Sequence, residues 1–235
     1  MASSPKRRTL TRWIVGVVAV VVVLAVGGPF VYFHFIQADP PPKLSLATTP
    51  VPSSAAGTTR SALAGTWKIT SDSLVRYRIN ETVLGQSGTA VGTTKSVTGS
   101  LTITGTKVTA ATFTVDMTTV ASDESQRDNQ FQNRIMDTAN FPTATFTLTS
   151  PIDLAPVPKD GALTNYSAPG KFQLHGTTKE VTFALTARRT GNVIAVQGDE
   201  PITFADYNIN NPSGGPASVG DSGRLEFVLQ FAPGA

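Results

Sequence analysis

Apolar and polar side chains alternate along most of the chain after residue 65, which is the period of β-strands. Short turn signals separate the alternating runs: Gly105-Thr106, which suits a type II′ turn, Gly176-Thr177 and a site near Gly191-Asn192. The runs predict about eight antiparallel strands with one apolar face. Such strands form either a two-sheet sandwich or a closed barrel, and the period of two does not choose between them.

One stretch, residues 122–142, has the pattern of a helix instead. Ser122 is the expected N-cap, and two acidic residues follow it in the first turn. Phe131 and Ile135 fall one turn apart on one face, and Pro142 prevents continuation. A narrow apolar stripe with a broad polar face predicts a helix that lies on a rim and buries little of itself.

The first 64 residues have a different composition. Residues 14–33 carry no charge and are long enough to cross a bilayer, and four Lys or Arg residues precede them. We expect a basic cytoplasmic tail over residues 1–12, a membrane anchor over 13–36, a Pro/Ser/Thr-rich linker over 37–64 and an extracytoplasmic domain over 65–235. A cleaved signal peptide is the alternative, and it exports the same domain.

Charge and cysteine content narrow the function classes. The whole chain has a net charge of +3, but the part before Gly65 holds six basic residues and one acidic one, which leaves −2 for the domain. A mildly acidic domain argues against nucleic acid as a partner. The chain has no cysteine, so disulfides, thiol chemistry and Cys-ligated metals are excluded.

Three segments in combination resemble a known family. They are "QRDNQFQNRIMDTANFPTATFTLTS" at 126–150, "GKFQLHGTTKEVTFAL" at 170–185 and "FADYNI" at 204–209. They are similar to the YceI-like family of bacterial exported lipid-binding proteins, and the similarity runs from about Trp67 to Phe231. The resemblance implies an extended eight-stranded, lipocalin-like antiparallel barrel around a long isoprenoid chain, with the helix beside the barrel mouth.

The phase of the alternation nominates residues that point into such a barrel. With Phe131 from the helix, the candidate ligand contacts are Phe113, Val115, Phe131, Phe146, Phe172, Leu174, Phe183, Leu185 and Phe227. For each of them alone, ordinary core packing is the more economical interpretation, whereas for the set the resemblance implies that some line a cavity. Arg127 is a tenth candidate, as a contact for an anionic head group, although a helical ion pair with Asp123 is the more economical interpretation.

No set of residues predicts catalysis. The segment "GDSGR" at 220–224 is similar to a serine protease motif, but the domain has one histidine, His175, in the wrong order. One histidine without cysteines or a carboxylate cluster is a poor metal site. We therefore expect a membrane-tethered protein that binds an isoprenoid-type or other long-chain lipid, without cofactor or metal. A β-sandwich interaction module is the alternative, and a homodimer is left open.

Overall fold

The computed structural model describes residues 40–46, 63–214 and 217–234. The predicted tail and anchor and most of the predicted linker lie outside these ranges. Within the described residues, no helix is both long and apolar enough to span a bilayer.

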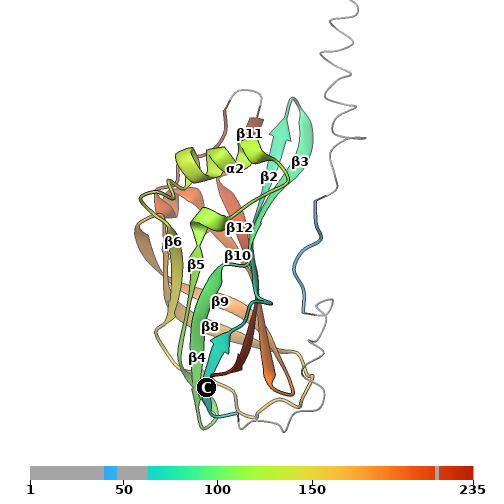
Figure 1. Ribbon diagram of the computed structural model, residues 1–235, viewed down its shortest axis with the longest axis vertical. Coiled ribbons are helices and arrows are strands. Elements are labelled where there is room, and N and C mark those ends of the chain that lie inside the picture. Colours follow the sequence, from blue (N-terminus) through green and yellow to red (C-terminus); the bar gives the residue numbers. More distant parts are fainter. Residues whose placement is uncertain (1–39, 47–62, 215–216, 235) are drawn as a thin grey trace, which may run out of the picture.

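Eight antiparallel strands close into a barrel (Figure 1). The closing pair is β1 with β12, where Ile69 lies opposite Phe231. Closure confirms the predicted barrel and excludes the two-sheet sandwich. In order around the barrel the strands are β1 (Gly65–Ile69), β4 (Val97–Thr104), β5 (Lys107–Asp116), β6 (Thr143–Leu148), β8 (Thr164–Leu174), β9 (Thr177–Thr190), β10 (Val193–Thr203) and β12 (Ser222–Pro233).

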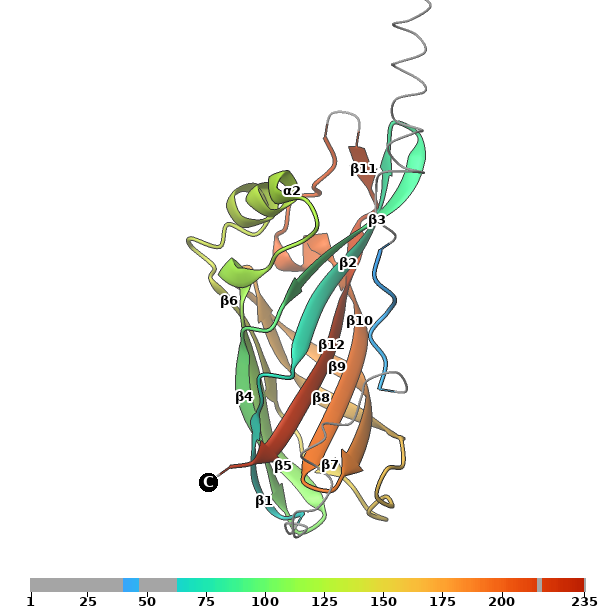
Figure 2. The same cartoon turned by 45° about the vertical axis from the view of Figure 1, so that its right-hand side comes forward.

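Four further strands extend the sheet beyond the closed eight-stranded barrel. β2 (Leu74–Val83) follows β1 along β12, and β3 (Gln86–Thr94) pairs with β2 in the same hairpin. The short strand β11 (Ala217–Val219) pairs with the far end of β2, while β7 (Ile152–Asp153) pairs with β5 at the other end. The barrel therefore has a helix end, at which β2, β3 and β11 project, and an opposite end (Figure 2).

The β-turns follow glycine positions, with one shift from the prediction. Gly105 has φ +59° between β4 and β5, as a type II′ turn requires. The β8–β9 turn is formed by His175 and Gly176, both with positive φ, so the predicted Gly176-Thr177 turn is wrong by one residue. Two consecutive positive φ values are the type I′ geometry, which matches the twist of the flanking strands.

The predicted helix lies across the helix end of the barrel (Figure 1). Its α-helical part, α2, covers Ser125–Gln130, and a π-helical turn, η4, covers Phe131–Ile135. Two 3-10 turns lie nearby, η3 (Met117–Thr119) and η5 (Phe204–Tyr207). Glu124 is the N-cap, two residues after the predicted Ser122, because the Asp128 carboxylate accepts hydrogen bonds from both the amide and the hydroxyl of Ser122.

Residues 40–46, called the strap below, lie in an extended path along the outside of β2, β12 and β10 (Figure 2). They belong to the predicted linker over 37–64, and Leu46 among them is 1% exposed and packs on Ala195 and Val228. This part of the predicted linker is therefore packed on the barrel. The physical reason is that the outer face of β10 and β12 offers both apolar and charged partners to the passing chain.

Candidate functional site

Five phenylalanines from five strands meet in the middle of the barrel and form a layer across it. Ring centroids of neighbouring members are 4.9 to 6.2 Å apart, in stacked or tilted pairs, and none of the five side chains is more than 6% exposed. The members of this phenylalanine layer are Phe113, Phe146, Phe172, Phe183 and Phe227.

Glycines in the wall make room for these rings. A Cβ atom at Gly198 would lie 2.3 Å from the ring of Phe227, which sits opposite it on the neighbouring strand. A Cβ atom at Gly170 would likewise lie 2.5 Å from the ring of Phe146. Each ring can therefore lie flat against the wall, where any larger residue would push it into the barrel.

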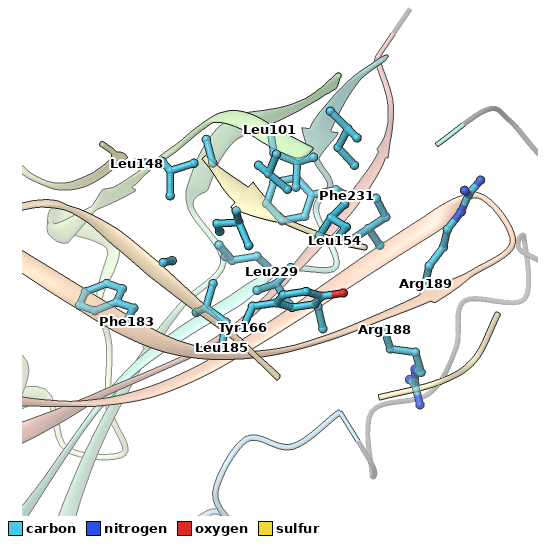
Figure 3. Close-up of a pocket in the computed structure, with 18 of the residues that line it drawn as sticks. Leu101, Leu148, Leu154, Tyr166, Phe183, Leu185, Arg188, Arg189, Leu229 and Phe231 are labelled. Carbon is cyan, nitrogen blue, oxygen red and sulfur yellow. The ribbon is translucent and has the colours of Figure 1, made fainter. Parts of the chain in front are cut away.

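An apolar cavity of about 140 Å³ lies between the layer and the opposite end of the barrel. Figure 3 shows leucine and phenylalanine side chains around it, with Tyr166 alongside and the guanidinium groups of Arg188 and Arg189 pointing away from it. Besides layer members, its wall includes Leu101, Ile103, Val108, Ala111, Leu148, Leu154, Ala168, Leu185, Ile194, Val196, Leu229 and Phe231. We call it the opposite-end cavity.

A second apolar cavity of about 190 Å³ lies between the layer and the helix. Phe113 lines both cavities, so the layer is the partition between them. The wall of this helix-end cavity includes Val75, Tyr77, Ile79, Val115, Met117, Phe131, Ile135, Met136, Ala144, Leu174, Ile202, Phe204 and Ile209. The interior of the described barrel is thus two chambers in series.

The structure brings all ten residues nominated from the sequence to these chambers. The opposite-end cavity is lined by Phe113, Phe146, Phe183, Leu185 and Phe227. The helix-end cavity is lined by Phe113, Val115, Phe131, Phe172, Leu174 and Arg127. That they contact a ligand stays a prediction.

Sequence reasoning missed the cationic rim of the opposite-end cavity. Arg188 and Arg189 both line it, and the Arg189 guanidinium lies 5.2 Å from the centre of the Trp67 ring. The signal was present in the alternation, because Arg189 has the same parity as the inward-facing Leu185. Both residues border the apolar wall with their guanidinium groups pointing away from the cavity, so their charge lies outside its lining.

The helix covers its chamber through a small set of contacts. The ring of Phe131 stacks on Tyr77 of β2 at 5.0 Å, and Met136 is 5% exposed beneath the helix. Arg134 Nη2 donates to the Pro212 carbonyl at 3.2 Å, which ties the helix to the loop before β11. The helix is therefore held to β2 and to the loop before β11, and its apolar stripe forms the ceiling of the cavity.

Arg127 is held by acidic neighbours. Its guanidinium lies 2.5 Å from Asp123 Oδ1 and 3.5 Å from Glu81 Oε1. Burial alone would lower the pKa of Arg127, but the hydrogen bond to Asp123 and the charge of Glu81 raise it overall. An anionic head group at this position would compete with two carboxylates, so the geometry favours the role of fastening the helix to β2.

The buried Tyr77 makes stability depend on pH. Burial raises the pKa of Tyr77 to about 12, against 10.0 in an exposed tyrosine. Above pH 10 the unfolded chain loses this proton first, so the free energy of unfolding falls until the folded tyrosine also titrates. Between pH 10 and 12 the native protein should lose about 2–3 kcal/mol more than the Tyr77→Phe variant.

Urea unfolding of both proteins at neutral and alkaline pH checks this expectation. Other tyrosines and the lysines titrate in both proteins, so their effects cancel in the difference. Equal losses for the two proteins would show that the Tyr77 ring is hydrated in the folded state.

The residues considered above for catalysis or metal binding either pack and hydrogen-bond within the fold or lie exposed on its surface. His175 Nδ1 lies 3.2 Å from the Tyr207 carbonyl oxygen, and its ring packs on Phe141. Asp221 and Ser222 lie exposed at the start of β12. Across residues 40–46, 63–214 and 217–234, no three His, Cys, Asp or Glu side chains gather as a metal site would require.

Comparison with known proteins places the barrel in a family. The chain matches no curated protein sequence. Among solved structures it is similar to a polyisoprenoid-binding domain from Saccharophagus degradans, implicated in plant cell wall breakdown, with 18% identity, a TM-score of 0.59 and coverage of 73% of this chain and 99% of that one. It is also similar to BcnA from Burkholderia cenocepacia, with 19% identity, a TM-score of 0.55 and coverage of 69% and 98%. The YceI-like domain family matches residues 67–231, which span the barrel from β1 to β12, and the chain therefore belongs to the YceI-like family.

Proposed function

We propose that this protein binds a long isoprenoid-type lipid inside the barrel while it is tethered to the outer face of the cell membrane. The observation that carries the proposal is the pair of apolar cavities in series, lined by side chains from seven of the eight barrel strands, all but β1. A solved structure with the same fold is described as a polyisoprenoid-binding domain. The uncharged run at 14–33, preceded by basic residues, supports the tether.

The size of the cavities sets the length of chain that they hold. An apolar cavity of about 150 Å³ accommodates a benzene molecule, which is close in size to one five-carbon isoprene unit. Burial stabilises each methylene-sized group by about 0.8 kcal/mol, or roughly 4 kcal/mol for one unit. Association costs about 4–15 kcal/mol in lost translational and rotational freedom. A chain that fills one cavity gains little, so tight binding requires both.

A chain that occupies both cavities must pass the phenylalanine layer. The rings of Phe113 and Phe227 are 5.5 Å apart, which is an ordinary packing distance and leaves no channel. Aromatic side chains move as whole rings about two torsions, and Gly198 and Gly170 allow the rings of Phe227 and Phe146 to lie close to the wall. Long lipids therefore bind with a rearrangement of the layer, whereas short ones do not need it.

Binding of prenyl alcohols of increasing length tests the proposal. The delipidated barrel is titrated with prenol, geraniol and farnesol, which carry one, two and three isoprene units, and the change in Trp67 emission reports occupancy beside the opposite-end cavity. We expect affinity to rise steeply with length and association to become slower once the layer must move. Equal, weak binding of all three alcohols would contradict the proposal. The role is sequestration or carriage, without catalysis.

A further inference from the structure

The strap is held to the barrel by hydrogen bonds that its own sequence favours. It begins with three consecutive prolines, which hold the backbone extended. Because proline has no backbone N–H, this segment makes no internal hydrogen bonds, and its carbonyl oxygens can accept from the barrel. Arg78 Nη2 donates to the Pro41 carbonyl at 2.6 Å, and Arg76 Nη1 donates to the Pro42 carbonyl at 3.1 Å. Docking a stiff segment of this kind costs little conformational entropy.

The second half of the strap adds burial. The Leu46 amide donates to Gln197 Oε1 at 2.8 Å, and the Leu46 side chain is almost fully buried on Ala195 and Val228. Burying a leucine contributes roughly 1.5–3 kcal/mol, which exceeds the contribution of the exposed Lys43–Asp199 pair. The strap is therefore a seated part of the folded domain.

The direction of the strap is fixed by the order of its contacts. Pro40 lies in a surface groove with Asn80, Thr82 and Ser218, where β2 and β11 pair at the helix end. Leu46 lies beside Gln197 and Val228, nearer the middle of the barrel. Followed from its first residue, the strap thus runs from the helix end toward the opposite end, as Figure 2 also shows.

We propose that the strap orients the barrel so that its helix end, with the helix-end cavity, faces the membrane. The inference rests on the proposed membrane anchor over residues 13–36, which is part of the proposed function. Residue 36 is four residues from Pro40, so the end of the anchor lies within about 14 Å of the helix end. The opposite end is farther away by much of the length of β9, a 14-residue strand of about 45 Å.

This orientation has a consequence for lipid exchange. A chain leaving the bilayer would meet the helix and the helix-end cavity before any other opening, without crossing bulk water. The β2–β3 turn projects at the same end, and Leu84 at its tip is 57% exposed with φ +52°. An exposed leucine on a projecting turn is suited to the interface of a bilayer.

Energy transfer to membrane acceptors tests the orientation in the full chain. The chain has no cysteine, so a single fluorophore can be placed at Asn129→Cys on the helix end or at Thr106→Cys on the opposite end, both at exposed positions outside the groove that holds Pro40. The labelled chain is reconstituted in phosphatidylcholine vesicles that carry acceptor lipids. We expect transfer from Asn129→Cys to exceed transfer from Thr106→Cys several-fold.

Two insertions distinguish orientation of the barrel by the strap from simple attachment of the barrel to the membrane. A long Gly/Ser segment inserted between Asp39 and Pro40 leaves the strap seated but frees it from the anchor, and it should remove the difference between the labels. The same segment inserted after Pro50 lengthens the chain beyond the strap, and it should leave the difference intact. Neither insertion alters a contact of the barrel, so both proteins should fold.

The outcomes decide between the proposals. Equal transfer from the two labels in the reconstituted native chain, or loss of the difference with the Pro50 insertion, would overturn the orientation. Lipid content is measured on the same samples and does not depend on orientation, so it reports the binding proposal separately. A chain that does not partition with the vesicles would refute the tether and the orientation together.

Discussion

Filling either cavity with one leucine is expected to remove most of the bound lipid while the barrel stays folded. Ala168 on β8 lines the opposite-end cavity and Ala144 on β6 lines the helix-end cavity, and both are at most 3% exposed. Leucine adds three carbon atoms, which take up more than half of the space of a five-carbon isoprene unit. Since a chain must fill both cavities to bind tightly, Ala168→Leu or Ala144→Leu alone should lower lipid content at least about tenfold, equivalent to about 1.4 kcal/mol.

The matched control uses the outer surface. Ala184 on β9 is exposed and lies across from Ser167, the neighbour of Ala168, so Ala184→Leu adds the same atoms outside the barrel. Lipid content is measured by extraction and mass spectrometry, and folding by urea unfolding. Filling a void of this kind should change the free energy of unfolding by less than about 1.5 kcal/mol. Full lipid content in both folded cavity variants would show that the lipid binds elsewhere.

Loss of the Glu226 carboxylate is expected to destabilise the protein more than loss of any surface charge. Glu226 is 1% exposed although it faces outward from β12, and its Oε1 lies 2.6 Å from Arg78 Nε. Arg76 lies directly across from Glu226 on β2, where burial lowers the pKa of its guanidinium and the charge of Glu226 raises it. Glu226→Ala therefore leaves cations under the strap without their counter-charge, at a cost of about 3–5 kcal/mol.

Urea unfolding measures this loss against two further variants. Glu180→Ala removes an exposed carboxylate, 4.0 Å from Lys171, and should change the free energy of unfolding by less than about 1 kcal/mol. The double variant Arg78→Met with Glu226→Leu removes the ion pair but leaves Arg76 without its counter-charge, so it should recover part of the lost stability. A Glu226→Ala variant as stable as Glu180→Ala would mean that water reaches the pair beneath the strap.

The parity of residues in the sequence was enough to predict which side chains face inward. On β12, Leu225, Phe227 and Leu229 alternate with outward residues, and successive side chains of a strand must point to opposite faces. Parity could not reveal that the outward Glu226 and Val228 are also buried. Their cover is the strap, more than 150 residues away in sequence, and its composition resembles that of a free linker.

The division of the interior into two cavities also could not be predicted from the alternation of apolar and polar residues. Alternation predicts one apolar lumen, whereas the two cavities arise from how Phe113, Phe146 and Phe227 pack in three dimensions. In the sequence, Gly198 and Gly170 indicate only positions of low strand propensity. Their role depends on the phenylalanine rings of neighbouring strands that lie against them. The helix was predicted correctly in place but not in its ends: it begins after Glu124 because Asp128 reaches back to Ser122, and its last turn ends at Ile135 rather than before Pro142.

The central claim is that a lipid occupies the barrel, and extraction of the full chain tests it most directly. The protein is purified from the membranes of its own host, extracted with organic solvent and analysed by mass spectrometry beside the Ala168→Leu and Ala144→Leu variants. We predict one prenyl or other long-chain lipid per barrel in the native protein and little in either variant. A native protein that is stable, folded and free of lipid would contradict the account.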